Sequence, residues 1–229
     1  MSDSDSFRLN KFLALHLGVS RRQADELIEK GRVSVNDTVA TLGARTVSGD
    51  TVAVDSTPIT TETALVYLAL NKPVGYVCSR RAQGDNPTIY TLLPEKYHTL
   101  KPVGRLDRDS SGLILLTNDG DFAQRMTHPS YYKVKRYEVT LDKPLEPLHQ
   151  QMINDFGVTL EDGPSKLTLE KQTDDRLSWI ITMHEGRNRQ IRRTFAALGY
   201  TVTLLHRTNF GDYSLGELAS GAFQEVSAL

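Results

Sequence analysis

The feature that most constrains this chain is an apolar run entered through a charged loop. The run, 113–117, holds four consecutive aliphatic residues and ends at the turn signal Asn118-Asp119-Gly120, so it predicts a buried strand. The preceding loop, 104–112, carries two aspartates and two arginines between glycines. A loop seated on the end of a buried strand is a usual place for catalytic side chains. An isolated Arg-Leu-Asp would instead indicate a solvated turn, so the functional interpretation depends on other stretches.

The N-terminal part of the chain, residues 7–54, predicts a small domain. Apolar residues at helical spacing indicate two successive helices within 9–31. Ser20 caps the second helix, and Gln23 three residues later completes a capping box. Residues 33–39 alternate around a turn dipeptide, which predicts a hairpin.

Residues 55–63 lack periodicity and contain a proline and several threonines, which indicates a linker. The remainder, 64–229, predicts a second domain that begins with a strand over 65–70. A strand over 76–78 would make Cys78 a small buried residue and not a nucleophile. A later helix is expected to begin at Asn188, a residue that favours the helix cap.

Charge is segregated along the chain, although the net charge is only −1. The stretch 122–137 has no acid, 184–207 has one, and acids gather in 138–175. Such segregation can create a phosphate-binding face, the alternative being basic loops scattered over the surface. Arg21 and Arg22 fall in the first turn of a helix, which disfavours cations but attracts an anion, so they indicate an incoming phosphate or simply tolerated surface charge.

Several protein classes are excluded by composition. No apolar run reaches the roughly 18 residues of a membrane span, and the polar, acidic start, residues 1–6, is unlike a secretory signal. The single cysteine excludes an internal disulfide and argues against a cysteine metal site. We therefore expect a cytoplasmic protein without membrane contact.

Four motifs together resemble one enzyme family. Gly-Arg-Leu-Asp followed by Ser-Gly-Leu, within 104–113, resembles the active-site motif of pseudouridine synthases of the RsuA/RluB type, which act on ribosomal RNA. Leu-Asn-Lys-Pro-x-Gly at 70–75 matches the family's first motif, which mainly shapes and braces the site, although Lys72 alone could be an exposed turn lysine. Lys-x-Tyr-x-Val at 135–139 and Gly-Arg-Asn-Arg-Gln-Ile-Arg-Arg at 186–193 match two further motifs. Residues 8–36 resemble the RNA-binding domain named after ribosomal protein S4.

The resemblance implies an α+β fold, with a small S4-like domain and a catalytic domain built on a mixed, mostly antiparallel sheet with flanking helices. It implies isomerisation of a uridine that is flipped from its stack. Asp107 would be the nucleophile, attacking either the ribose or the base, with Arg192, ahead of Arg193, as its ion-pair partner. Arg105 would fill the vacated space, and Tyr137 would stack on the base or remove the proton from its carbon 5. Further substrate contacts are expected from Lys72, Lys135, Arg189 and Arg193, and RNA contacts of the first domain from Arg8, Lys11, Arg21, Arg22 and Arg32.

The expected partner is ribosomal RNA or a pre-ribosomal particle, bound by a monomer. Residues 157–164 resemble the large-subunit branch of the family more than the small-subunit branch. Isomerisation needs no redox step, and the sequence lacks a cysteine or histidine cluster, so no cofactor or metal is expected. The segment from Leu204 onward is expected to form further strands and to contribute no catalytic or binding residues.

Two other functions fit parts of the sequence. A non-catalytic RNA-binding or assembly factor would keep the first domain and the basic stretches but would not require Asp107. A glycoside-cleaving enzyme would use paired carboxylates, for which Asp109 is a nominal second acid. Aromatic residues that could bind sugar are sparse, with one tryptophan, Trp179.

Overall fold

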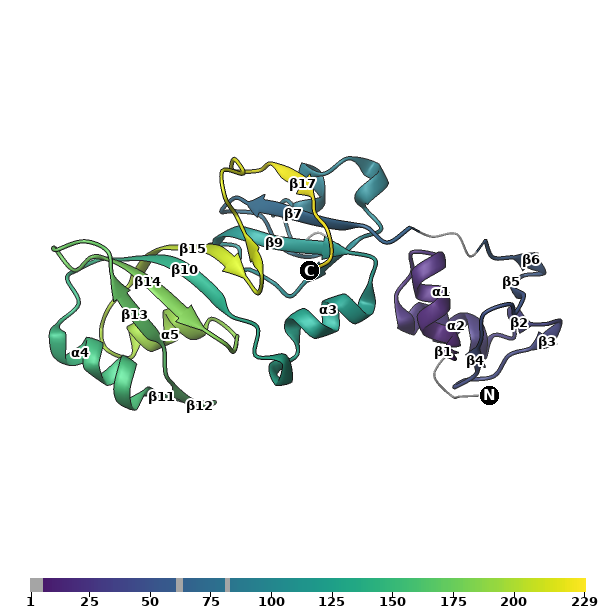
Figure 1. The fold of residues 1–229 in the computed structure, drawn as a ribbon, viewed down its shortest axis with the longest axis horizontal. Helices are drawn as coiled ribbons and strands as arrows, with labels where there is room; N and C mark the ends of the chain where they lie inside the picture. The colour runs from purple at the N-terminus through teal and green to yellow at the C-terminus, as the bar shows by residue number, and fades with distance from the viewer. Residues whose placement is uncertain (1–5, 61–63, 81–82) are drawn as a thin grey trace. The chain divides into compact units, whose positions relative to one another are not determined.

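The computed structural model describes residues 6–60, 64–80 and 83–229, and the chain forms two compact units (Figure 1). The first unit contains residues up to Val66 together with the short segments Thr99–Lys101 and Thr117–Gly120, and the second contains the rest. The α+β class and the mixed, mostly antiparallel sheet predicted from the sequence are confirmed.

The first unit is built on two short helices, α1 (Leu9–His16) and α2 (Arg21–Glu29). Leu13 of α1 and Ile28 of α2 are buried in a shared hydrophobic core. The predicted capping box is present, because the Ser20 hydroxyl accepts from the Gln23 amide (3.2 Å) and the Gln23 side chain accepts from the Ser20 amide (2.9 Å). The remaining elements are the short strands β1 (Phe7–Arg8), β2 (Val33–Val35), β3 (Thr38–Val39), β4 (Arg45–Thr46), β5 (Val52–Val54) and β6 (Thr57–Pro58).

The predicted hairpin joins β2 to β3 through Asn36 and Asp37, both at positive φ, as a tight two-residue turn requires. The linker expected over 55–63 is wrong in its first part. Asp55 and Ser56 form a second such turn, and β6 pairs with β5 in the same small sheet. Backbone pairing there outweighs the irregular sequence pattern. Residues 61–63 of the expected linker lie outside the described residues.

The second unit is organised around one large sheet, nine-stranded in the described part of the chain, with the order β13-β14-β10-β15-β9-β7-β17. Strand β16 pairs with β15, and β8 pairs with β9. The contact between β15 and β9 is parallel, whereas β10 pairs antiparallel with both β14 and β15. The strands are β7 (Tyr67–Lys72), β8 (Lys101–Val103), β9 (Ser111–Thr117), β10 (Lys135–Leu141), β13 (Thr168–Lys171), β14 (Ser178–Met183), β15 (Val202–Phe210), β16 (Tyr213–Ser214) and β17 (Phe223–Glu225).

Helices and turns flank this sheet. Helix α3 (Gly120–Thr127) follows β9, and α5 (Gln190–Ala196) precedes β15. The other elements are the 3-10 turns Ile89–Leu92, Glu95–Tyr97 and Pro129–Tyr131, helix α4 (Pro147–Gln151), the π-helical turn Met152–Phe156, and a hairpin of β11 (Val158–Leu160) and β12 (Gly163–Ser165).

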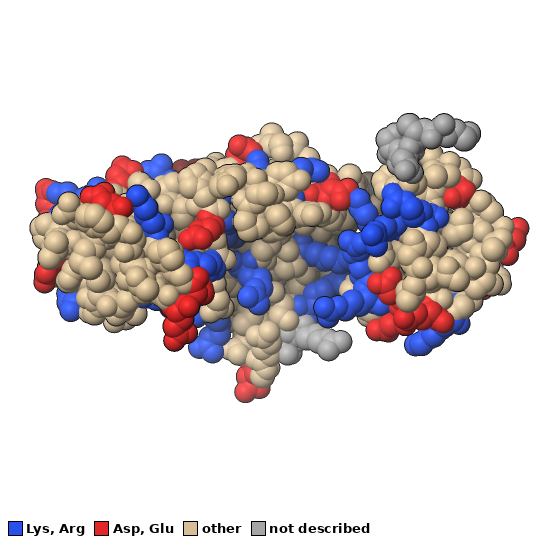
Figure 2. Space-filling model, turned by 90° about the horizontal axis from the view of Figure 1, so that it is seen from below, with Lys and Arg blue, Asp and Glu red and all other residues tan. Residues whose placement is uncertain are grey.

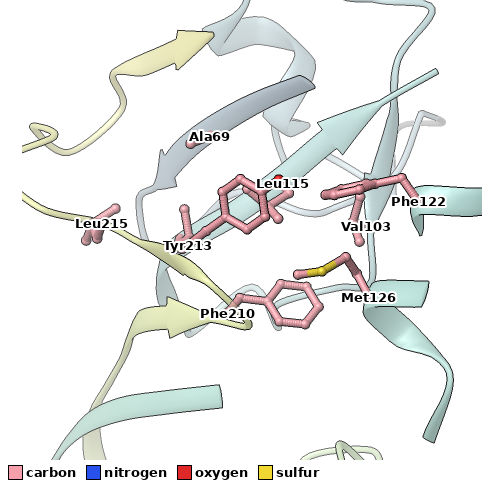
Figure 3. Packing of buried hydrophobic residues seen from close by; sticks show 9 residues of the cluster. Ala69, Val103, Leu115, Phe122, Met126, Phe210, Tyr213 and Leu215 are labelled. Carbon is pink, nitrogen blue, oxygen red and sulfur yellow. The ribbon is translucent and has the colours of Figure 1, made fainter. Parts of the chain in front are cut away.

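The predicted apolar strand, β9, lies in the core of the second unit. Its residue Leu115 packs with Phe122 and Met126 of α3 and with Phe210 at the end of β15 (Figure 3). Because each of these side chains is nearly inaccessible to solvent, the loop that enters β9 stands on a rigid support.

Gly112 explains why the motif needs a second glycine. It has φ +105°, and a Cβ at this position would lie 2.2 Å from the backbone oxygen of Arg207. The parallel pairing of Gly112 with Arg207 therefore requires a residue without a side chain. This close approach fixes β15 against the start of β9, next to the charged loop.

Candidate active site

Asp107 lies in the loop between β8 and β9, on the wall of a pocket of about 350 Å³. The pocket brings together residues from three of the four motifs, 104–113, 135–139 and 186–193, and from β15. Its lining includes Arg105, Asp107, Lys135, Tyr137, Arg189 and Arg207. Among the described residues, five arginines or lysines line the pocket against two carboxylates, Asp107 and Glu185, so it suits a polyanionic ligand. Figure 2 shows Lys and Arg side chains around a hollow in the second unit, with acids beside it.

Lys72, which was predicted to contact the substrate, instead holds the Asp107 loop from the protein interior. Lys72 is fully buried and lies outside the pocket lining. Its ammonium group donates to the backbone oxygens of Ser110 (2.6 Å) and Pro73 (2.9 Å). Burial lowers the pKa of Lys72 to about 8, against the opposing pull of Cys78, Asp107 and Asp109. The substrate-contact prediction for Lys72 is therefore wrong, because its side chain points into the protein and braces the loop.

Cys78 gives the loop a second brace. The strand predicted over 76–78 is reduced to a bridge between Val77 and Thr88. The Cys78 sulfur exchanges hydrogen bonds of 3.4 Å with the amide and carbonyl of Leu106. Burial raises the pKa of the Cys78 thiol, which agrees with a structural role.

Arg189 is the residue that pairs with Asp107. Its Nη1 lies 3.5 Å from Oδ2 of Asp107, and its two terminal nitrogens donate to the two carboxylate oxygens of Asp109 (3.0 and 2.9 Å). These bonds from Arg189, followed by the charge of Arg192, hold the pKa of Asp109 below its usual range. One guanidinium thus neutralises both acids of the loop.

Arg192, the partner that the resemblance implies for Asp107, contacts Asp109 instead. Its side chain donates to the backbone oxygens of Asp109 (2.7 Å) and Val202 (2.7 Å), and its Nε lies 3.4 Å from the Asp109 carboxylate. Arg192 is absent from the pocket lining. It ties α5 to the loop and to the start of β15, so the pairing prediction is corrected to Arg189.

The start of α5 also differs from the prediction. Arg189, at φ +46°, precedes the first helical residue, so Asn188 is not the cap. The Asn188 carbonyl accepts a hydrogen bond from Arg193 (2.9 Å). The left-handed turn directs the Arg189 side chain toward the aspartates, a geometry that no local sequence rule favours for arginine.

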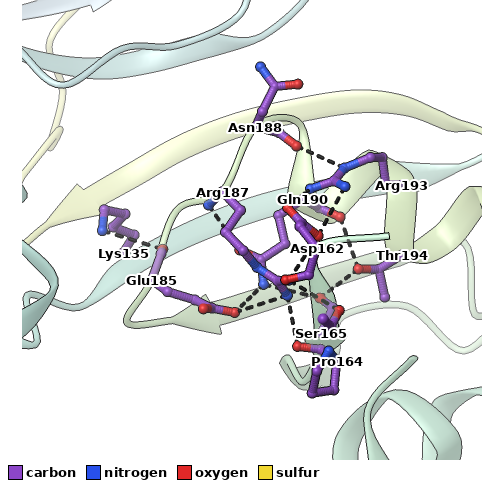
Figure 4. A network of polar contacts seen from close by, with 11 residues as sticks. Lys135, Asp162, Pro164, Ser165, Glu185, Arg187, Asn188, Gln190, Arg193 and Thr194 are labelled. Atoms are coloured by element: carbon purple, nitrogen blue, oxygen red, sulfur yellow. Dashed lines mark hydrogen bonds and ion pairs between the residues drawn. The ribbon is translucent and has the colours of Figure 1, made fainter. Parts of the chain in front are cut away.

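Arg193 and Arg187 converge on one carboxylate, Asp162 in the turn between β11 and β12 (Figure 4). Arg193 donates two hydrogen bonds to it (3.1 and 2.7 Å), and Arg187 donates one (2.9 Å). Arg193 does not line the pocket, and its predicted substrate contact stays a prediction. Asp162 was missed because it is 25 residues or more from both arginines.

Tyr137 and Lys135 share one face of β10 and both line the pocket. Tyr137 is 7% exposed. Arg136, on the opposite face of the strand, pairs with Glu170 at 3.1 Å. Arg105 is exposed and lines the pocket, and no hydrogen bond or ion pair to the described residues holds its side chain.

Arg207 is the pocket residue that sequence reasoning missed, since the segment from Leu204 was expected to add no chemistry. It is 2% exposed and lies opposite Tyr137 in the β10–β15 register. Its Nε donates to the Leu113 carbonyl (2.8 Å). The sequence signals were its place in the basic stretch 184–207 and its position inside a predicted strand, where a buried arginine demands a partner or a function.

The predicted RNA contacts of the first unit lie in β1, α1, α2 and the segment before β2, and none of them is buried. Arg21 donates to the Asn10 side chain (3.3 Å), which brings the start of α2 next to the stretch that carries Arg8 and Lys11. Arg22 is exposed. Arg32, by contrast, forms an ion pair with Asp55.

Among residues 6–60, 64–80 and 83–229, no three His, Cys, Asp or Glu side chains are grouped to hold a metal ion. Within the same described residues, no helix is both long and apolar enough to cross a membrane.

Comparisons with known proteins agree with this architecture. Residues 66–197 match the RNA pseudouridylate synthase family, and residues 7–52 match the S4 domain. The chain is 41% identical to ribosomal small subunit pseudouridine synthase A of Pasteurella multocida, covering 96% of both chains. It is 37% identical to ribosomal large subunit pseudouridine synthase B of Bacillus subtilis, covering 96% of this chain and 92% of the relative. A crystal structure of a pseudouridylate synthase superposes with a TM-score of 0.69 at 35% identity over 96% of each chain. The chain therefore belongs to the RNA pseudouridylate synthases, a family of isomerases, and carries an S4 domain at its N-terminal end.

Proposed function

We propose that this enzyme converts a specific uridine of ribosomal RNA to pseudouridine, with Asp107 as the nucleophile. The observation that carries the proposal is the position of the Asp107 carboxylate, on a pocket wall that it shares with Tyr137 and Arg189. The relatives from Pasteurella multocida and Bacillus subtilis, each named for a ribosomal subunit, support ribosomal RNA as the substrate class.

In the proposed reaction the uridine leaves its stack and enters the pocket base first. Arg105, whose side chain no described residue holds, fills the space left behind. Tyr137 stacks on the uracil ring, and its phenolic oxygen is the candidate acceptor for the proton of carbon 5. Arg189 orients the Asp107 carboxylate without a covalent role.

The S4 domain supplies phosphate contacts to the RNA around the target through Arg8, Lys11, Arg21, Arg22 and Arg32. We propose that the protein works as a cytoplasmic monomer on free ribosomal RNA or a pre-ribosomal particle, and that it needs no cofactor or metal. The resemblance of residues 157–164 to the large-subunit branch of the family supports large-subunit ribosomal RNA as the substrate. Relatives named for either subunit match this chain at similar identity.

The test is to map pseudouridines in the ribosomal RNAs of both the large and the small subunit, from cells with and without the gene. We expect one site to be lost on deletion, and to return with a plasmid that encodes the wild-type chain but not the Asp107→Asn variant. Unchanged maps would refute ribosomal RNA as the substrate, and restoration by Asp107→Asn would refute the nucleophile.

A further inference from the structure

Two cations, Lys135 and Arg207, face the pocket without a carboxylate partner of their own among the described residues. They lie against the same aromatic ring, with the Arg207 Cζ 4.8 Å and the Lys135 Nζ 5.4 Å from the centroid of Phe210. Phe210 is 1% exposed and also lines the pocket. The ring faces of aromatic residues attract cations but carry no countercharge, so the net charge at this point stays positive.

The hydrogen bonds of these cations leave one buried nitrogen without a partner in the described part of the chain. The Lys135 ammonium lies 3.5 and 3.4 Å from the backbone oxygens of His184 and Glu185. Nη2 of Arg207 is buried and has no partner among the described residues. A buried donor without a partner is costly to the fold, which indicates a group that meets its partner in another state.

The two charges also oppose each other. Burial lowers the pKa of Lys135, and the charge of Arg207 lowers it further, with only Glu185 acting against them. The Glu185 carboxylate is itself bonded to Arg187 and Gln190. An anion between the two cations would relieve this repulsion.

The position of these groups relative to Tyr137 decides which anion fits. Arg207 stands opposite Tyr137 on the neighbouring strand, and Lys135 lies two residues before it on the same face of β10. A base stacked on Tyr137 would therefore present its edge to both cations. A nucleotide enters such a pocket base first, so its phosphates remain at the mouth, whereas Arg207 is 2% exposed.

We propose that Arg207 and Lys135 bind the detached uracil as an anion, through its carbonyl oxygens, while it turns between its two points of attachment. The inference rests on the proposed function, because the uracil must leave the ribose to be reattached.

The electron pair of the bond between N1 and carbon 1′ stays on the uracil when that bond breaks, and carbon 1′ takes up the Asp107 carboxylate. The resulting negative charge spreads over N1 and the two carbonyl oxygens, where fixed donors stabilise it. In the return step carbon 5 supplies the pair that bonds to carbon 1′, and the carboxylate leaves. The proton on carbon 5 then departs, and N1 gains one.

The experiment compares Arg207→Met and Lys135→Met with the wild type and with Arg136→Met as the matched control. Arg136 lies on the same strand as Lys135 but on its opposite face, paired with Glu170. Each protein is assayed in single turnover on RNA that carries uridine or 5-fluorouridine at the target, with filter binding alongside. Chromatography of the digested RNA separates nitrogen-linked from carbon-linked nucleosides for both substrates. The carbon-linked product of 5-fluorouridine keeps its fluorine, because carbon 5 there has no proton to lose.

Arg207→Met and Lys135→Met should each lower the uridine rate about 10²–10³-fold, the usual effect of removing one donor to a developing anion, with RNA affinity within a few-fold of wild type. The loss should be smaller with 5-fluorouridine, because fluorine itself stabilises the uracil anion. Arg136→Met should match the wild type on both substrates. Lys135→Met removes a half-buried side chain near the strand end, so it carries the test even if Arg207→Met fails to fold.

Three results would overturn the inference: wild-type rates in both variants, equal losses on both substrates, or a loss of affinity that accounts for the loss of rate, which would indicate a phosphate contact. Failure of the proposed function looks different, since the wild type would then convert neither RNA.

Discussion

Arginines cluster around the starts of two helices of this chain, α2 and α5, and the two sets have different surroundings. At α2, Arg21 and Arg22 are exposed, and the only hydrogen bond of either side chain to the described residues is the 3.3 Å contact of Arg21 with the neutral Asn10. Around α5, Arg189 is bonded to Asp109 and Arg193 to Asp162, at distances down to 2.7 Å. The same sequence pattern, arginines around a helix start, therefore occurs in two different settings. The difference comes from Asp109 and Asp162, which are distant in sequence and are brought next to α5 by the fold. The exposed arginines of α2 remain available to the phosphates of a ligand. The paired arginines around α5 hold loops of the second unit in place.

Among the changes that test this comparison, the largest effect should come from breaking the pairing at the pocket. Arg189→Gln removes the one guanidinium shared by Asp107 and Asp109, so we expect the single-turnover rate to fall about 10²-fold through misplacement of the nucleophile. RNA affinity should change little. Tritium release from RNA labelled at carbon 5 of uridine measures the rate. Arg193→Gln, on the same helix but bonded to Asp162, is the control, and equal losses in the two variants would contradict a specific role for Arg189.

Lys72 differs from both sets of arginines, because it is buried and its ammonium group donates to backbone carbonyl oxygens and not to a carboxylate. Its pKa of about 8 lies below the ordinary 10.5, so the folded state binds fewer protons between these values and stability rises with pH. From pH 8 to 10.5, the unfolding free energy of the wild type should rise by about 3 kcal/mol relative to that of Lys72→Met. Urea titrations at both pH values measure it. A flat or falling difference would contradict a charged, desolvated Lys72.

The pairing at Asp162 should matter less for chemistry than the pairing at Asp109, because neither Asp162 nor Arg193 lines the pocket. Asp162→Asn leaves Arg187 and Arg193 without their shared carboxylate, so we expect a lower Tm and a rate loss smaller than that of Arg189→Gln. Scanning calorimetry and the tritium assay measure the two effects. A rate loss as large as that of Arg189→Gln would show that Asp162 acts on the reaction more directly.

The smallest effect should come from the exposed pair. Arg21→Gln with Arg22→Gln should leave the rate at saturating RNA unchanged and weaken binding. The slope of log affinity against log salt should become shallower by about 0.7–0.9 for each phosphate that the variant no longer neutralises. Filter binding across a salt series measures this, with the exposed Lys171→Gln of the second unit as control. An unchanged slope would mean that these arginines do not meet phosphates.

Local rules account for the parts of the fold that the sequence predicted well. The capping box of Ser20 and Gln23, the two-residue turn at Asn36 and the apolar strand of Leu115 each depend on neighbours in sequence. The errors share a different origin. The choice between Arg189 and Arg192 as partner of Asp107 depends on the left-handed turn before α5 and on a loop about 80 residues away.

The pocket itself was predicted only where a motif resembled a known one. Tyr137 and Asp107 were identified in this way, although their roles remain proposals. Arg207 was missed because its importance arises from the parallel contact of β15 with Gly112, which no local pattern specifies. Lys72 was misassigned because an exposed turn lysine and a buried brace have the same sequence appearance.

The central claim is that the Asp107 carboxylate performs the chemistry while the surrounding arginines position it and the S4 domain holds the RNA. The most direct test is Asp107→Asn in the tritium-release assay, with RNA affinity measured on the same preparation. The substitution keeps the side-chain volume and removes the nucleophile. We predict no release above background and an affinity within a few-fold of wild type, whereas normal turnover in this variant would contradict the mechanism.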